Sequence, residues 1–199
     1  MIFKNKKAII FDLDGTIVKL QVDWGHLSRL LTKNFETNHG SGYKFSNITQ
    51  IFNKVLELGD QDELLEYFDI VKSFELKQIN RTVLIKNVIF FINNLSLFGV
   101  GEDIILAILS LNMHETIYQA LKLAGISDKF KLIVGKEDVR KWKPDPEGLL
   151  KIKEYFKLDP DEMVYFGDLQ KDVSTGDNAG IDVYLIDELI SLVKNRQEN

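Results

Sequence analysis

The chain has 199 residues, of which 45% are hydrophobic and 28% are charged, a composition typical of globular proteins and unlike that of disordered or collagen-like chains. Its formal net charge is -5, so we expect neither nucleic acid nor an anionic membrane as a partner. There is no cysteine, which excludes disulfides, thiolate metal sites and cysteine nucleophiles. The apolar runs are too short to cross a bilayer, and we therefore expect a soluble, cytoplasmic protein.

Five short apolar runs predict the strands of a buried sheet. They are residues 8–11, 104–109, 132–134, 163–166 and 183–186. Amphipathic stretches that fit helices lie between them, at about residues 86–98, 114–124, 146–157 and 172–179. This alternation of strand and helix favours an α/β fold in which helices cover both faces of a parallel sheet.

Residues 20–84 interrupt the alternation, because they show helical periodicity and no convincing strand. Their apolar residues form three stripes at helical spacing: Leu27, Leu30, Leu31 and Phe35; Ile48, Ile51, Phe52 and Val55; Leu64, Leu65, Phe68 and Val71. We interpret the stripes as packing faces. The sequence therefore predicts a helical subdomain at residues 20–84, inserted into a core made of residues 1–19 and 85–199.

Polar residues follow three of the predicted strands. Asp12 and Asp14 follow the first, Ser110 follows the run at 104–109, and Asp168 follows the run at 163–166. Ligands of open parallel sheets bind beyond the carboxyl ends of the strands, so we expect these side chains to converge. Lys143, in the loop after residues 132–134, should open on the same side.

Carboxylates gathered in one place repel each other unless a cation neutralises them. Mg²⁺ is held by one or two carboxylates and keeps several waters, which suits Asp12 and Asp168, with Asp172 as a further candidate. A calcium-binding EF-hand loop starting at Asp12 fails on register, because its glycine position falls on Ile17 and its twelfth position on Asp23. The sequence predicts magnesium as the cofactor.

A phosphoryl group fits the space beside such a metal. Asp12, at the strand tip, is the better placed nucleophile, while Asp14 is suited to protonate the leaving alkoxide and then to deprotonate the attacking water. Ser110 would hydrogen-bond a phosphoryl oxygen, and Lys143 would balance the charge that develops on the phosphoryl group. The residues thus indicate phosphoryl transfer through an aspartyl-phosphate.

These motifs, taken in order, resemble those of the haloacid dehalogenase superfamily in its phosphatase branch. The matching residues are Phe-Asp-Leu-Asp-Gly-Thr at 11–16, Ser110, Lys-Pro-Asp-Pro at 143–146, and Gly-Asp at 167–168 with Asp172. The resemblance implies a Rossmann-like three-layer core with five parallel strands in the order 3-2-1-4-5. It also implies that residues 20–84 are similar to the helical cap of phosphoglycolate phosphatases and β-phosphoglucomutases.

The resemblance assigns further roles to individual residues. It implies that Asp14 lends its backbone carbonyl to the metal alongside Asp12 and Asp168, and that Asp172 supports the metal through water or through Lys143. Ser110 and Lys143 match phosphate-binding positions, and Asn112 is a third candidate for phosphate binding.

We therefore expect a Mg²⁺-dependent phosphatase that hydrolyses a small, soluble phosphorylated metabolite, in the manner of a phosphoglycolate phosphatase. The presence of Asp14 favours this branch, since dehalogenases lack the second aspartate. A sugar phosphomutase with the same catalytic residues is the alternative, and a non-catalytic phosphate- or metal-binding module is a third interpretation.

Overall fold

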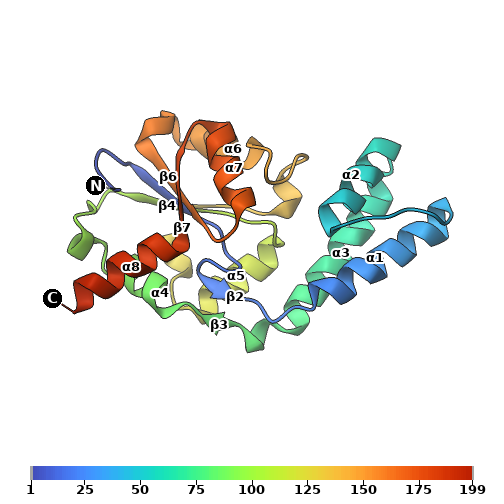
Figure 1. Cartoon of the computed structure of the whole chain (residues 1–199), viewed down its shortest axis with the longest axis horizontal. Helices are drawn as coiled ribbons and strands as arrows, with labels where there is room; N and C mark the ends of the chain where they lie inside the picture. The colour runs from blue at the N-terminus through green and yellow to red at the C-terminus, as the bar shows by residue number, and fades with distance from the viewer. Residues whose placement is uncertain (1, 199) are drawn as a thin grey trace.

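Five parallel strands form the central sheet of the computed structural model, which describes residues 2–198 (Figure 1). The strands are β1 (Ala8–Phe11), β4 (Ile105–Leu109), β5 (Leu132–Val134), β6 (Met163–Gly167) and β7 (Asp182–Leu185). Their order across the sheet is β5-β4-β1-β6-β7. Numbered within this sheet alone, the order is 3-2-1-4-5, so the predicted α/β fold and strand order are confirmed.

The register of the central strand places the ends of three strands side by side. Phe11, the last residue of β1, pairs with Ile108 of β4 and with Phe166 of β6. The backbone N–H of Asp12 then donates to the carbonyl of Phe166 at 2.8 Å, which extends this pairing by one residue. The segments that follow β1, β4 and β6 therefore leave the sheet at the same edge.

Helices cover both faces of the sheet. The faces are distinguished by alternate residues of β1: Ile9 and Phe11 pack with α4, α5 and α8, whereas Ala8 and Ile10 pack in the cluster that includes α6 and α7. The helices are α4 (Lys86–Asn93), α5 (His114–Leu123), α6 (Glu147–Phe156), α7 (Gln170–Ala179) and α8 (Ile186–Gln197). Because both faces of β1 are covered, the strand is wholly apolar and fully buried.

One predicted helix is shorter in the structure, and one helix of the structure was not predicted. The helix expected at 86–98 ends at Asn93, because the Asn94 side chain donates to the carbonyl of Phe90 at 2.8 Å, and a 3₁₀ turn follows at Leu95–Phe98. Helix α8 was not predicted from the sequence. Ile186, Leu189 and Val193 are buried at helical spacing there and were the available signal.

Gly176 lies inside α7 for a packing reason. A Cβ atom at this position would lie 2.6 Å from the Cβ of Val183 in β7. Glycine weakens a helix interior by about 1 kcal/mol relative to alanine. Here it allows α7 to lie directly against the edge strand of the sheet.

Residues 18–84 contain three helices at one end of the molecule, joined to the rest by a short antiparallel ribbon (Figure 1). The ribbon consists of β2 (Val18–Lys19) and β3 (Val83–Leu84), and the helices are α1 (Trp24–His39), α2 (Ile48–Leu58) and α3 (Gln61–Lys77). Each helix begins at an Asx cap whose side chain accepts a backbone N–H of the first turn: Asp23, Asn47 and Asp60.

The stripes predicted for these helices are buried except at three positions, of which Leu30 and Ile48 are half-buried and Leu65 is exposed. Leu65 is 60% exposed, and the buried face of α3 continues through Tyr67 instead. Within residues 2–198, no helix combines the length and the apolar character that a bilayer crossing requires.

Candidate active site

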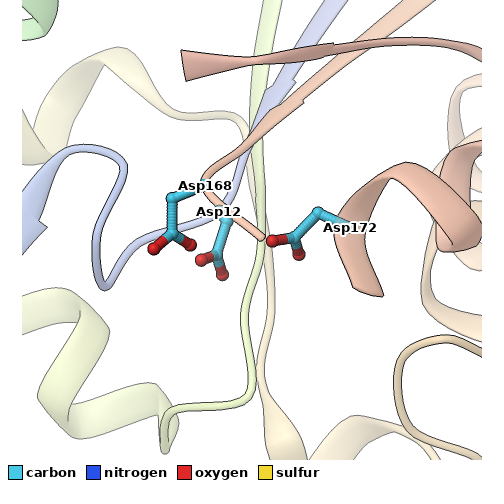
Figure 2. A group of neighbouring side chains, drawn as sticks. All are labelled: Asp12, Asp168 and Asp172. Carbon is cyan, nitrogen blue, oxygen red and sulfur yellow. The ribbon is translucent and has the colours of Figure 1, made fainter. Parts of the chain in front are cut away.

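Three carboxylates meet at the edge of the sheet where β1 and β6 end. Asp12 follows β1, Asp168 follows β6, and Asp172 lies in the first turn of α7. One carboxylate oxygen of each lies within 4.8 Å of the others, and the three side chains point toward a common space (Figure 2). The structure thus brings together three of the residues singled out in the sequence, from segments more than 150 residues apart.

Gly15 lets the turn after β1 pass close to Asp168. Its φ angle is 89°, and a Cβ atom would lie 2.1 Å from Asp168 Oδ2. The turn is closed by a hydrogen bond of 2.7 Å from the N–H of Gly15 to the carbonyl of Val18. A side chain at position 15 would therefore displace the Asp168 carboxylate.

Lys143 is buried behind Asp12 and links it to Asp172. Its ammonium donates to Asp12 Oδ1 at 2.8 Å, to Asp172 Oδ1 at 2.7 Å and to the hydroxyl of Tyr165 at 2.8 Å. Burial would lower the pKa of Lys143, but Asp12 and Asp172 outweigh it and raise the pKa above its ordinary value. Lys143 therefore stays charged.

The carboxylates have different environments. Burial, followed by the nearby charges of Asp12 and Asp172, raises the pKa of Asp168 to about 6. Burial also acts on Asp172, but Lys143 and the hydroxyl of Tyr165 outweigh it and hold the pKa of Asp172 below its ordinary value. Asp168 is thus the carboxylate of this group that most lacks a neutralising cation.

Asp14 stands apart from the other three carboxylates. Its Oδ1 accepts the backbone N–H of Leu20 at 2.8 Å, and it lines the same cavity as Asp12. Burial, the largest effect, raises its pKa above the usual value of an aspartate. A protonated carboxyl group is what a general acid requires.

The loop that carries Lys143 is fixed by side chains on both sides of it. Asp145 Oδ1 accepts the backbone N–H of Glu147 at 3.0 Å, as expected for a cap of the helix that follows. The amide of Asn178 in α7 donates to the carbonyl of Pro144 at 3.0 Å. These contacts hold the backbone from which Lys143 reaches Asp12.

Ser110 and Asn112 form a buried pair after β4. The hydroxyl of Ser110 donates to Asn112 Oδ1 at 2.9 Å, and Asn112 Nδ2 donates to Glu75 Oε1 at 2.8 Å. Glu75 Oε2 accepts the backbone N–H of Met113 at 3.0 Å. Both polar atoms of the Asn112 side chain therefore have protein partners, and the second N–H of Nδ2 is the donor that remains for its predicted phosphate contact.

A cavity of about 1140 Å³ opens above this edge of the sheet. Five of the predicted site residues line it: Asp12, Asp14, Ser110, Asn112 and Asp168. The opposite wall is formed by α1 and by residues 43–49, which precede and begin α2. Lys143 and Asp172 are not among the lining residues and lie behind Asp12.

Three residues of this region were not predicted from the sequence to belong to the site. Tyr165 lies within the apolar strand β6, Glu75 lies in α3, and Lys136 follows β5. Their partners are distant in the chain, so spacing gave no signal for Glu75 or Lys136. A tyrosine in a strand buried on both faces was a usable signal, because its hydroxyl must find a partner.

Comparisons with known proteins agree with this geometry. Residues 9–186 match the haloacid dehalogenase-like hydrolase family. Pyrophosphatase PpaX of Listeria welshimeri is 35% identical over 78 residues, which cover 39% of this chain and only 36% of that protein. PpaX of Oceanobacillus iheyensis is 24% identical over 180 residues, which cover 88% of this chain and 80% of the relative.

The fold is also found among solved structures. That of a predicted phosphoglycolate phosphatase from Haemophilus somnus has a TM-score of 0.60 and 20% identity, and it covers 96% of this chain and 92% of that one. Because the family match extends over most of the sequence and includes every motif at the edge of the sheet, the chain belongs to the haloacid dehalogenase-like hydrolases.

Proposed function

We propose that the protein is a Mg²⁺-dependent phosphatase that hydrolyses a small phosphomonoester, such as phosphoglycolate, through a phosphorylated Asp12. The position of Asp12 carries the proposal. Its carboxylate lines the cavity, is held by the buried ammonium of Lys143 at 2.8 Å, and has Asp168 beside it. The family match and the PpaX relatives, named as pyrophosphatases, support chemistry at phosphorus.

Asp12 is the proposed nucleophile. One of its carboxylate oxygens attacks phosphorus, the P–O bond to the substrate's alcohol breaks, and an aspartyl-phosphate forms. Lys143, which already donates to Asp12 Oδ1, fixes the orientation of the carboxylate and lies close to the charge that develops on the phosphoryl group. Ser110 is the proposed donor to a phosphoryl oxygen, for which its hydroxyl hydrogen must turn from Asn112 Oδ1 toward the substrate.

Asp14 is the proposed general acid and base. Its raised pKa favours the protonated form, which can donate a proton to the departing alkoxide. The resulting carboxylate then takes a proton from the water that attacks phosphorus, the bond between phosphorus and Asp12 breaks, and phosphate and free Asp12 are restored. Each proton that Asp14 gives in the first step is thus recovered in the second.

The donor set fits a hard divalent cation. Asp168 has no cationic partner within ion-pair distance among residues 2–198, and burial, followed by the charges of Asp12 and Asp172, raises its pKa to about 6. Both oxygens of Asp172 are already engaged, by Lys143 and by the N–H of Leu169 at 3.1 Å. The proposed metal ligands are therefore Asp12, Asp168 and the carbonyl of Asp14. Asp172 supports the site indirectly, through Lys143. Bound Mg²⁺ would neutralise oxygens of the phosphoryl group.

We further propose that residues 20–84 act as a cap that covers the substrate. Helix α1 and residues 43–49 form the cavity wall opposite the catalytic carboxylates. The segment leaves and rejoins the core through the β2–β3 ribbon, so its orientation is set by two neighbouring strands. A cap of this kind excludes water from the phosphoryl group during the first step.

The substitution Asp12→Asn tests the proposal. It keeps an oxygen for Lys143 but removes the nucleophile, so hydrolysis of p-nitrophenyl phosphate with Mg²⁺ should fall by about a thousandfold or more. Asp103→Asn, in an exposed loop, is the matched control and should leave the rate unchanged. Removal of Mg²⁺ by a chelator should abolish turnover by the unaltered protein.

Retention of more than about a tenth of the activity by Asp12→Asn would overturn the assignment of the nucleophile. Circular dichroism of the two variants establishes that both are folded, so a loss of activity can be attributed to chemistry.

A further inference from the structure

Lys136 is a buried cation in the wall of the cavity that contains Asp12 and Asp168. Only 5% of the residue is exposed. Among residues 2–198 its ammonium has neither a hydrogen bond nor an ion pair, and it lies over the ring of Phe52 at 4.8 Å from the centroid. Burying an ammonium without an anionic partner is costly, so this arrangement indicates that an anion completes it.

The backbone of Lys136 is held beside the predicted phosphate-binding pair. Its N–H donates to the carbonyl of Asn112 at 3.0 Å, and its own carbonyl accepts the indole N–H of Trp142 at 2.9 Å. Phe52, the contact of its ammonium, belongs to α2. The side chain of Lys136 therefore extends from the core, next to Asn112, toward the helices of residues 20–84.

Glu75 does not satisfy Lys136. Its two carboxylate oxygens accept hydrogen bonds from Asn112 and Met113, and neither lies within the 4.0 Å of an ion pair with the Lys136 ammonium. Burial lowers the pKa of Lys136 to about 8, an effect that Glu75 partly offsets. At neutral pH the lysine is therefore mostly protonated and free to bind an anion.

The rest of the cavity wall is also cationic. Apart from the three aspartates at the edge of the sheet, the lining contains six cationic side chains and a single carboxylate, that of Glu36. The cationic residues are Lys19, Arg29, Lys33, Lys44, Lys136 and Lys171. Such a surplus attracts a substrate whose negative charge is not confined to the phosphoryl group being cleaved.

We propose that the substrate carries a second anionic group, a carboxylate or a second phosphate, and that Lys136 binds it. The inference rests on the proposed phosphatase function and specifies its substrate class. The transferred phosphoryl group lies against Asp12, the second anion contacts the Lys136 ammonium, and the cationic face of α1 covers the substrate. Lys136 is thus a specificity-determining residue rather than a participant in phosphoryl transfer.

The test compares substrates that differ only in the second group. One pair is phosphoglycolate and 2-hydroxyethyl phosphate, which tests a carboxylate. The other is propane-1,3-diyl bisphosphate and 3-hydroxypropyl phosphate, which tests a phosphate. For at least one pair, the unaltered enzyme should show a kcat/KM about tenfold or more higher for the substrate that carries the second anionic group, as expected for a charge-assisted hydrogen bond.

Lys136→Met should reduce that preference by about tenfold or more, whereas Lys136→Arg should keep part of it. Lys141→Met, at an exposed lysine of the next loop, is the matched control and should leave the preference unchanged. Because the preference is a ratio measured on one preparation, it does not depend on how much of a variant is folded.

Three outcomes would overturn the inference: no preference in either pair, a preference that persists in Lys136→Met, or equal losses for both members of a pair. Equal losses would mean that Lys136 only balances the charge of Glu75. Failure of the proposed function is distinguishable, because the unaltered protein would then hydrolyse none of these esters and no p-nitrophenyl phosphate.

Discussion

Lys143 has three oxygen partners in a position where only 5% of the residue is exposed. Two of the partners are the carboxylates of Asp12 and Asp172, and the third is the hydroxyl of Tyr165, which itself donates to Asp172 Oδ1 at 2.8 Å. Buried charges are tolerated when each is paired and hydrogen-bonded, as they are here. Tyr165 thus completes an arrangement that orients Asp12 without touching it.

Removal of the Tyr165 hydroxyl tests this arrangement at the scale of one residue. Tyr165→Phe takes a donor from Asp172 and an acceptor from Lys143, so the free energy of unfolding should fall by about 1–3 kcal/mol in urea denaturation. Tyr184→Phe, on the neighbouring strand β7, removes a hydroxyl that has no hydrogen bond to residues 2–198 and should cost less than about 0.5 kcal/mol. Equal costs for the two variants would contradict the role of Tyr165.

At the scale of elements, a buried carboxylate links α1 to α3. Glu63 of α3 accepts hydrogen bonds from the hydroxyl of Tyr67 at 2.7 Å and from the amide of Asn38 at 2.9 Å, and it pairs with His39 Nε2 at 2.6 Å. Burial alone would raise the pKa of Glu63, but these contacts outweigh it and lower the pKa. The ionised carboxylate therefore stabilises the packing of the two helices.

This lowered pKa predicts a pH-dependent effect of Glu63→Gln. A carboxylate whose pKa is lower when folded contributes stability above its unfolded pKa of about 4.3 and loses it as the pH falls through the folded value. At about pH 7 the free energy of unfolding of the variant should be about 1–3 kcal/mol lower than that of the unaltered protein. This difference should shrink as the pH falls below about 4.

Glu57→Gln is the matched control in a neighbouring helix. Glu57 pairs with Lys54 at 2.9 Å on an exposed surface, and its loss should cost less than about 0.5 kcal/mol. If Glu63→Gln lowers the free energy of unfolding by the same amount at about pH 7 and below about pH 4, the carboxylate acts through its shape and not through its charge.

At the scale of the whole molecule, the cavity lies between two parts of the chain that differ in their chemistry. The sheet edge supplies the carboxylates Asp12, Asp14 and Asp168, whereas α1 supplies cationic side chains such as Arg29 and Lys33. The buried apolar cluster on the α6–α7 side of the sheet includes residues of α1, α2 and α3, so the helices at the far end share a core with the sheet. This shared packing positions the cationic wall opposite Asp12.

Much of this architecture could be predicted from the sequence because its signals are local. The run at 8–11 is apolar throughout, as a strand buried on both faces must be, and the residues at 11–16 mark the turn after it. The helix ending at Asn93 and the exposed Leu65 could not be predicted, since a side-chain cap and the packing of α3 decide them. The spacing of apolar residues along the sequence gives no signal for the side-chain cap or for the packing of α3.

The candidate site also contains some residues that could be predicted from the sequence and others that could not. Asp12 and Asp168 could be placed together because both follow strands that end at one edge of a parallel sheet. The contacts of Lys136 and Glu75 could not be predicted, because they join loops of the core to α2 and α3 and depend on how those helices dock. Residues whose roles arise from tertiary contacts were thus the ones that sequence reasoning missed.

Chemical trapping of the intermediate tests the central claim most directly. The Asp14→Asn variant should react with p-nitrophenyl phosphate, whose leaving group needs no acid, but should lose the phosphoryl group from Asp12 slowly. Acid quenching followed by borohydride reduction converts an aspartyl-phosphate to homoserine, which peptide mass spectrometry locates. We predict homoserine at position 12 alone. Homoserine at position 168, or p-nitrophenol release with no residue converted, would contradict the account.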